Sequence, residues 1–146
     1  MISTLELEGT IHIKITDKTG KVIYDMPFQN AVLAYGKEGV LEQLLATPSV
    51  QKPTHMELGT GSPTTEKLGA FITDSRIPFI SKVRSGQSII MKCLYPSGTA
   101  MTGIKEAGLF NSPVNNAAGM YCSAYFSTVN KDAGSSLELT WTLTVL

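Results

Sequence analysis

Charged residues are scarce in this chain, because Asp, Glu, Lys and Arg make up 16% of its 146 residues, against about 25% in an average soluble domain. Twelve basic and twelve acidic residues cancel one another. The chain therefore has no net charge that would gather phosphates, and a nucleic-acid partner is not expected. A neutral surface rich in Ser, Thr, Asn and Gly suits a protein that packs against copies of itself or against other proteins.

Long apolar runs and cysteines are few as well. No segment approaches the roughly 20 apolar residues that a membrane-spanning helix needs, and the first residues lack the basic and then apolar regions of a secretory signal. We therefore expect a soluble protein, made in the cytosol, without membrane insertion. Cys93 and Cys122 lie in separate apolar patterns without Cys-x-x-Cys spacing or a nearby His. This predicts two buried thiols in a reducing compartment rather than a metal site.

Imidazoles are limited to His12 and His55. His12 falls on the polar side of an alternating segment, and His55 begins a strand pattern just after Pro53. Nucleophilic catalysis needs a Ser, Cys or Thr next to an oriented base, and neither His belongs to a motif of that kind. We expect both histidines to have surface or structural roles.

Acids within apolar strand patterns are limited to Glu57 and Glu106, which makes them the sole candidates for the carboxylate pair that glycosidases use. An acid in such a short strand is more often hydrogen-bonded to nearby backbone or directed at a subunit boundary. The segment Gly59-Thr60-Gly61 begins like a phosphate-binding loop but lacks the remaining residues of that motif. Its glycines are predicted to allow a tight bend, and the chain to be non-enzymatic, without cofactor or metal.

The most regular pattern in the chain is its last segment, residues 136–146. Large apolar residues alternate there with small polar ones, as in a strand with one buried face. The apolar positions are Leu137, Leu139, Trp141, Leu143 and Val145, and the polar positions are Ser136, Glu138, Thr140, Thr142 and Thr144. We predict a central strand of a sheet.

The first half of the chain predicts a hairpin and a helix. Residues 1–26 read as the hairpin, with a first strand over residues 5–15, a bend or bulge at Gly9, and a turn at residues 17–20. The helix is predicted over residues 30–46, with Asn30 as its cap, and most securely over residues 37–46. Gly36 and Gly39 are expected to weaken its middle.

The remainder, residues 54–146, supplies the main sheet strands. Strand patterns cover residues 54–58, 77–83, 88–94, 104–110, 120–129 and 136–146. Residues 64–71 fit a turn or a short helix. Pro78 has no N–H to donate and therefore indicates an edge. With roughly eight strands, one short helix and no internal repeat, residues 1–146 predict a mainly β fold. We expect one single-domain antiparallel β-sandwich, jelly-roll-like in character.

Three segments together resemble a family of small tailed-bacteriophage virion proteins and tail-fibre-like modules. They are residues 56–62 (Met-Glu-Leu-Gly-Thr-Gly-Ser), residues 104–110 (Ile-Lys-Glu-Ala-Gly-Leu-Phe) and residues 137–145, where Thr and apolar residues alternate around Trp141. Gly119-Met120 and the segment around Asn30 add to the resemblance. It implies a non-enzymatic virion structural protein, present as repeated copies in the tail, baseplate, collar or a capsid appendage. Its expected partners are copies of itself and other virion proteins.

Two surfaces are candidate interfaces. One is the polar loop of residues 111–118, with Asn111, Asn115 and Asn116, and the other is the Thr140, Thr142 and Thr144 side of the last strand. Such loops on rigid scaffolds often carry recognition. The alternative function is therefore a β-sandwich module that binds host surface glycans, with Tyr95 and Tyr121 either stacking on a sugar or packing at the margins of the core.

Overall fold

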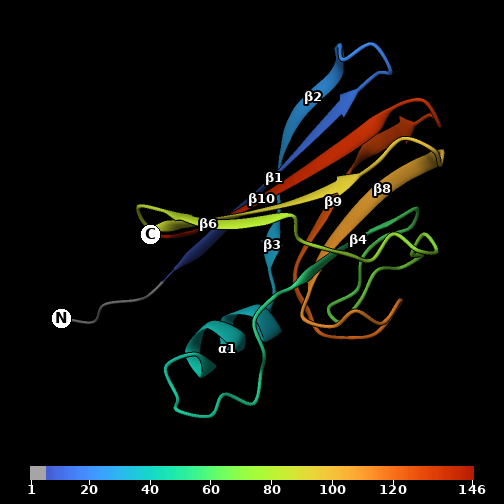
Figure 1. Ribbon diagram of the computed structural model, residues 1–146. Helices are drawn as coiled ribbons and strands as arrows, with labels where there is room; N and C mark the ends of the chain where they lie inside the picture. Colours follow the sequence, from blue (N-terminus) through green and yellow to red (C-terminus); the bar gives the residue numbers. More distant parts are fainter. Residues whose placement is uncertain (1–5) are drawn as a thin grey trace.

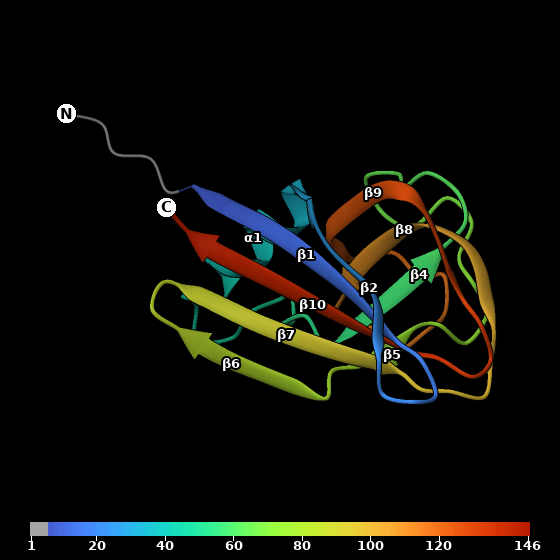
Figure 2. The same cartoon turned by 90° about the horizontal axis from the view of Figure 1, so that it is seen from above.

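The computed structural model describes residues 6–146 as two antiparallel β-sheets and one helix (Figure 1). The elements are β1 (Leu7–Thr16), β2 (Val22–Gln29), β3 (Ala31–Val32), α1 (Ala34–Glu42), β4 (His55–Gly59), β5 (Ile77–Pro78), β6 (Ser81–Ser85), β7 (Ser88–Tyr95), β8 (Met101–Phe110), β9 (Met120–Lys131) and β10 (Ser136–Val145). Sheet A has the order β2-β1-β10-β7-β6, and sheet B has the order β3-β9-β8-β4-β5. The predicted single-domain β-sandwich with one short helix is confirmed (Figure 2).

Strand β10 lies in the centre of sheet A, between β1 and β7. Its inward side chains Leu137, Leu139 and Trp141 are completely buried, and Trp141 stands opposite Ile11 on one side and Met91 on the other. Fully burying one large apolar side chain contributes about 1.5–3 kcal/mol. The alternation of the last segment thus predicts both the strand and its buried face correctly.

The N-terminal hairpin is confirmed from residue 7 onward, while Leu5 lies outside the described residues. Its turn is closed by the Asp17 carboxylate, which accepts the N–H groups of Thr19 at 2.8 Å and Lys21 at 3.0 Å. The expected bulge at Gly9 is wrong, because β1 pairs with β10 without a break across Gly9. Gly9 instead leaves room for the Asn30 side chain, which occupies the position that a Cβ would take.

The helix is shorter than the sequence predicts. Asn30 does not cap it, because Leu33 is the N-cap residue and the intervening residues 31–32 form β3 against β9. Pairing with a neighbouring strand satisfies backbone groups that a first helical turn would leave free. Gly36 and Gly39 are the buried residues of α1, and their lack of side chains lets the helix approach Tyr121 closely.

Loops cover the outer face of sheet B. Residues 64–71 form bends rather than a helix, and Phe71 bridges to Gly59. Phe110 packs there with Leu68 and Met120 in a small second core. Its neighbour Leu109 belongs to the main core between the sheets. The single strand predicted over residues 77–83 is wrong, because the chain leaves sheet B after β5 and enters sheet A at β6. Strand β5, which carries Pro78, is an edge strand as predicted. No helix within residues 6–146 has the length and hydropathy that crossing a membrane requires.

Candidate functional site

The inner face of sheet A extends beyond the part that sheet B covers. Trp141 and Met91 form a buried row across the sheet, at 0% and 1% exposure. In the next row, Leu143 stands opposite Ile89, and Ile89 is 37% exposed. Figure 1 shows β6, β7 and β10 running on towards the C-terminus past the strands of sheet B. Apolar side chains on this inner face are therefore left partly open.

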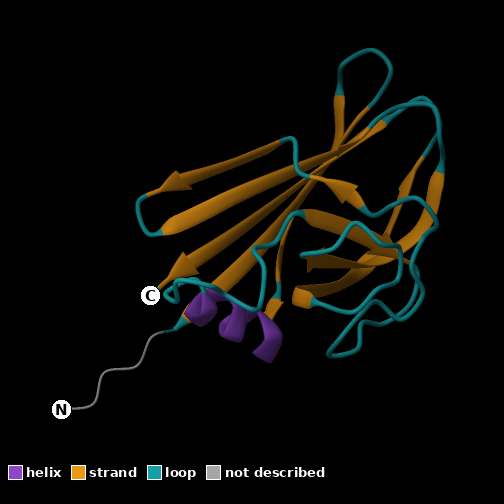
Figure 3. Cartoon of the chain, turned by 60° about the horizontal axis from the view of Figure 1, so that its bottom comes forward, coloured by secondary structure: helices purple, strands orange, loops and turns teal. Residues whose placement is uncertain are grey.

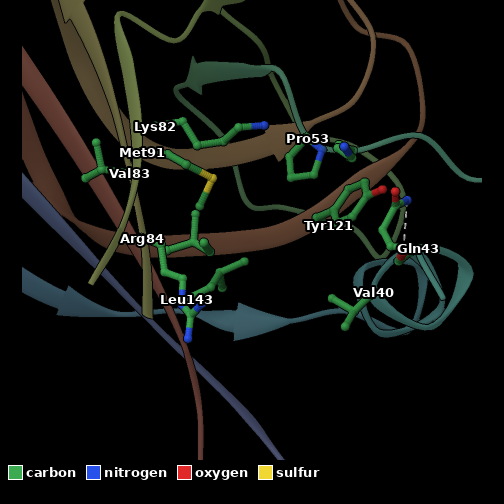
Figure 4. A pocket seen from close by; sticks show the side chains of 12 residues that line it. Val40, Gln43, Pro53, Lys82, Val83, Arg84, Met91, Tyr121 and Leu143 are labelled. Carbon is green, nitrogen blue, oxygen red and sulfur yellow. Dashed lines mark hydrogen bonds between the residues drawn. The ribbon is translucent and has the colours of Figure 1, made fainter. Parts of the chain in front are cut away.

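Helix α1 stands opposite this uncovered face, at the same end of the molecule as the C-terminus (Figure 3). Between them is a groove with a volume of about 390 Å³. Met91, Ile89 and Leu143 line it from the sheet, and Val40 and Tyr121 line it from the opposite side (Figure 4). The groove is mainly apolar, as ligand and partner sites commonly are.

Three cations stand around this apolar groove. Lys82 and Arg84 come from strand β6, and Lys52 comes from the segment before β4, whereas no acidic residue of the described part of the chain lines the groove. Figure 4 shows Lys82 and Arg84 on the groove side of β6 and Val83 pointing away from it. Within residues 6–146 none of these three cations takes part in an ion pair. The groove therefore combines an apolar floor with uncompensated positive charge.

The apolar surface continues onto the far side of α1. A second hollow, lined by Leu7, Val40, Leu41 and two charged residues, adjoins the groove at Val40. Leu41 is 59% exposed and Leu44 is 83% exposed. The helix predicted over residues 30–46 would include Leu44, but α1 ends at Glu42, so Leu44 lies beyond it.

The predicted threonine surface is assembled on one face. Thr140, Thr142 and Thr144 are half-buried on the outer side of β10. Thr142 stands between Thr10 of β1 and Ile90 of β7. The Thr144 hydroxyl lies 2.7 Å from that of Ser88. The three threonines thus share an uncharged strip at the middle of the outer sheet, away from the groove.

The predicted loop surface is less unified. The Asn111 side-chain amide donates hydrogen bonds to the Tyr35 hydroxyl at 2.9 Å and to the Gln51 carbonyl at 3.2 Å. The Asn116 backbone N–H donates to Glu57 at 3.1 Å. Asn115 remains exposed. Two of the three asparagines are therefore committed to contacts within the fold.

The two embedded acids make structural hydrogen bonds. Glu106 is completely buried, and its carboxylate accepts backbone N–H groups from Gly61 at 2.6 Å, Gly69 at 2.7 Å and Ala70 at 2.9 Å. The prediction that such an acid binds nearby backbone is confirmed. The chain bends at Thr60 and Gly61 as predicted. The glycines also make room for the carboxylate, because a Cβ on Gly59 would lie 2.6 Å from Glu106 Oε2.

Glu57 is held in a buried ion pair with Arg76. The Arg76 Nε and Nη2 atoms donate to the two Glu57 carboxylate oxygens at 3.1 Å and 3.2 Å. Arg76 also donates to the backbone carbonyls of Ser112 at 3.3 Å and Ala117 at 2.8 Å. This ion pair therefore fastens the polar loop to sheet B. The predicted contact of Glu57 with backbone is present at the Asn116 N–H, whereas its arginine partner was not predicted.

The remaining candidates also have local roles. His12 contacts Asp25 on the exposed face of sheet A, and His55 Nδ1 lies 2.7 Å from the Thr54 hydroxyl. Burial, with a smaller contribution from the Arg76 charge, lowers the pKa of His55. Tyr95 and Tyr121 are 3% and 2% exposed, so they pack in the core rather than offering a platform for a sugar.

Both cysteines are buried and free, as the sequence predicts. Burial raises the pKa of the Cys93 thiol to about 12. Burial likewise raises the pKa of the Cys122 thiol to about 12. Both side chains therefore behave as small core residues.

Comparisons with protein-family models, curated proteins and solved structures found no match for this chain. The groove was not predicted from the sequence. One signal for it was present, because the segment Ser-Lys-Val-Arg-Ser at residues 81–85 alternates basic and small residues within a strand pattern. Two cations on the inner face of a strand indicate that the opposite sheet does not cover this face.

Proposed function

We propose that this chain is a non-enzymatic structural protein of a tailed-bacteriophage particle, where repeated copies pack against one another or against other virion proteins. The observation that carries the proposal is the uncovered inner face of sheet A. The groove adjoins, at Val40, a second hollow that reaches the exposed Leu41 of α1, and this extends the apolar surface. Extended apolar surface of this kind commonly marks a site of protein association.

The bacteriophage assignment is supported by the sequence resemblance. Two of its motifs form a single structural unit, because Glu106 of the Glu-Ala-Gly-Leu-Phe segment binds the backbone of the Gly-Thr-Gly segment at Gly61. A third motif places Trp141 at the centre of the core. The resemblance therefore involves residues that build the fold.

The contacts of the two buried carboxylates, Glu57 and Glu106, support a binding role rather than a catalytic one. The Glu57 and Glu106 carboxylates are engaged by an arginine and by backbone N–H groups. In this arrangement both carboxylates stabilise the fold, and each would have to break several hydrogen bonds to transfer a proton. The groove offers apolar contact and positive charge.

Mass spectrometry of purified phage particles that encode this chain tests the proposal. We expect the chain among the virion proteins, in a copy number that follows the symmetry of the layer it occupies. Cryo-electron microscopy of the same particles then locates that layer in the tail, baseplate, collar or capsid appendage. Absence of the chain from intact particles, together with a strictly monomeric protein in solution, contradicts the proposal.

A further inference from the structure

The free edge of strand β6 is the most accessible pairing edge of the sandwich. The other edge strands are β2, β3 and β5. Strands β3 and β5 have two residues each, and β2 is interrupted by Pro27, which has no N–H to donate. Strand β6 has five residues, all exposed, and contains no proline.

The hairpin geometry identifies which backbone groups of β6 are free. Strands β6 and β7 are joined by the two residues Gly86 and Gln87, so that Ser85 pairs with Ser88, and Gly86 has a φ of +58°. In such a hairpin the residues flanking the loop form a hydrogen-bonded pair, and every second residue repeats this arrangement. The N–H and C=O groups of Lys82 and Arg84 therefore point away from β7, towards the open edge.

Side-chain direction adds charge to this edge. Lys82 and Arg84 have their side chains on the groove side, whereas Val83 faces the outer side. A strand added beside β6 would place every second side chain next to these cations. Carboxylates at two alternate positions of the added strand would complement the charges of Lys82 and Arg84. Apolar residues further along the same side of that strand would contact the uncovered groove.

The same charges disfavour self-pairing of β6. If two copies paired antiparallel about Val83, Lys82 of one copy would stand opposite Arg84 of the other, and like charges directly opposite one another destabilise a sheet. Basic residues on an edge are a common protection against indiscriminate association. The edge therefore excludes its own copy and remains open to an acidic strand.

We propose that β6 and the adjoining groove bind an extended segment of a neighbouring virion protein in which two carboxylates occupy alternate positions between apolar residues. The segment adds to sheet A as a further strand, as in other cases of strand addition. Its backbone pairs with Lys82 and Arg84, and its carboxylates lie beside their side chains. This inference rests on the proposed function, because it supplies the chemistry of a partner in the particle.

The test uses the full chain and a fluorescein-labelled peptide, acetyl-Leu-Thr-Glu-Val-Glu-Thr-Leu-amide, in an anisotropy titration. The peptide reads the same in both directions, so it fits parallel or antiparallel pairing. We expect it to bind, and the Lys82→Glu/Arg84→Glu variant to bind it at least about tenfold more weakly. The same variant should gain affinity for the peptide in which Lys replaces both Glu residues.

Two controls isolate charge and backbone pairing. The Lys18→Glu/Lys67→Glu variant changes net charge equally at exposed positions outside the groove, and it should bind like the unmodified chain. A peptide N-methylated at both Glu residues and at the Val between them keeps its side chains but loses ladder donors in either pairing direction, so its affinity should fall. Circular dichroism verifies that each variant is folded.

The outcomes separate this inference from the proposed function. If the Glu peptide does not bind, or if N-methylation leaves its affinity unchanged, strand addition at β6 is wrong. Detection of the chain in phage particles would still support the structural function in that case. If the chain is absent from particles while the peptide binds as expected, the strand-addition site holds and the virion assignment of its partner fails.

Discussion

At the scale of single residues, Glu106 shows how a buried charge is accommodated. Its carboxylate accepts three backbone N–H groups, from Gly61, Gly69 and Ala70, and Gly59 leaves the space that the carboxylate needs. Hydrogen bonds to a charged acceptor are stronger than those between neutral groups. This arrangement joins the loop of residues 61–70 to strand β8.

Replacing Glu106 with glutamine should therefore destabilise the protein. The amide keeps the shape but places an NH2 group against backbone donors, so at least one of these part-buried N–H groups loses its acceptor. We expect the free energy of unfolding to fall by about 2–4 kcal/mol. Urea denaturation followed by circular dichroism measures the change.

Glu138→Gln is the matched control for this substitution. The Glu138 carboxylate lies 3.7 Å from the ammonium of Lys92 and 3.9 Å from that of Lys14, and all three side chains are partly exposed. Exposed ion pairs contribute about 0–1 kcal/mol, so this variant should unfold almost as the unmodified chain does. Equal losses for both variants would contradict the role assigned to Glu106.

The buried thiols give a second prediction at the residue scale. The pKa values of Cys93 and Cys122 are raised by burial to about 12, so at pH 8 only about one thiol in 10⁴ is ionised in the folded state. The thiolate is the reactive species. We expect negligible labelling of the folded protein by iodoacetamide and labelling of both cysteines in urea, as measured by mass spectrometry.

The same pKa values set a direction for stability against pH. Above about pH 9 the unfolded chain loses thiol protons that the folded chain keeps, so the folded state binds more protons than the unfolded one. Its stability therefore falls as the pH rises from about 9 towards 12. Rapid labelling of either cysteine under native conditions would show that its thiol is not buried in solution.

At the scale of elements, the strands were easier to predict than the helix. The last strand has a side-chain period of two over its whole length, and each inward position is apolar. Helix α1 has buried glycines where an amphipathic helix would have large apolar residues. Its position follows from contact with Tyr121 of β9, which is distant in sequence, and no local pattern could indicate that contact.

The contact between α1 and Tyr121 is testable with Gly36→Ala. Alanine in an exposed helix normally stabilises it by about 0.5–1 kcal/mol relative to glycine. At Gly36 the added methyl group would overlap the backbone carbonyl of Tyr121, and we expect a loss of about 1–3 kcal/mol instead. Thermal unfolding monitored by circular dichroism gives the sign.

Glu38→Ala is the control within the same helix. Glu38 is exposed, so its replacement should change the stability by less than about 0.5 kcal/mol. A stabilised Gly36→Ala variant would mean that α1 does not press against β9 in solution. The groove would then be wider in solution than in this structure, because α1 forms one of its walls.

At the scale of the whole molecule, the candidate binding surfaces depend on how far one sheet extends past the other. The alternation of β7 and β10 indicates inward apolar side chains along their whole length. The alternation does not indicate where sheet B ends, so it cannot show which of these side chains remain exposed. The groove depends on this relation between distant segments, whereas the threonine strip follows directly from the sequence of β10.

The threonine strip on the outer face of sheet A is the second surface that the proposed assembly can use. Thr142 lies at its middle, between Thr10 and Ile90, and Val83 at the end of the same row is 53% exposed. The row of Thr10, Thr142, Ile90 and Val83 carries no charge and is readily desolvated, whereas an introduced lysine must keep its ammonium in water. Thr142→Lys should therefore be tolerated in the monomer and reduce incorporation into particles.

The measurement combines unfolding of the purified variant with quantitative mass spectrometry of phage particles assembled in its presence. We expect a stability change below about 1 kcal/mol and a several-fold lower copy number. Thr128→Lys, at an exposed threonine of β9 in sheet B, is the control for an added charge and should be incorporated normally. Normal incorporation of Thr142→Lys would mean that the outer face of sheet A stays in water, and the groove beside β6 would then be the surface through which the chain is held.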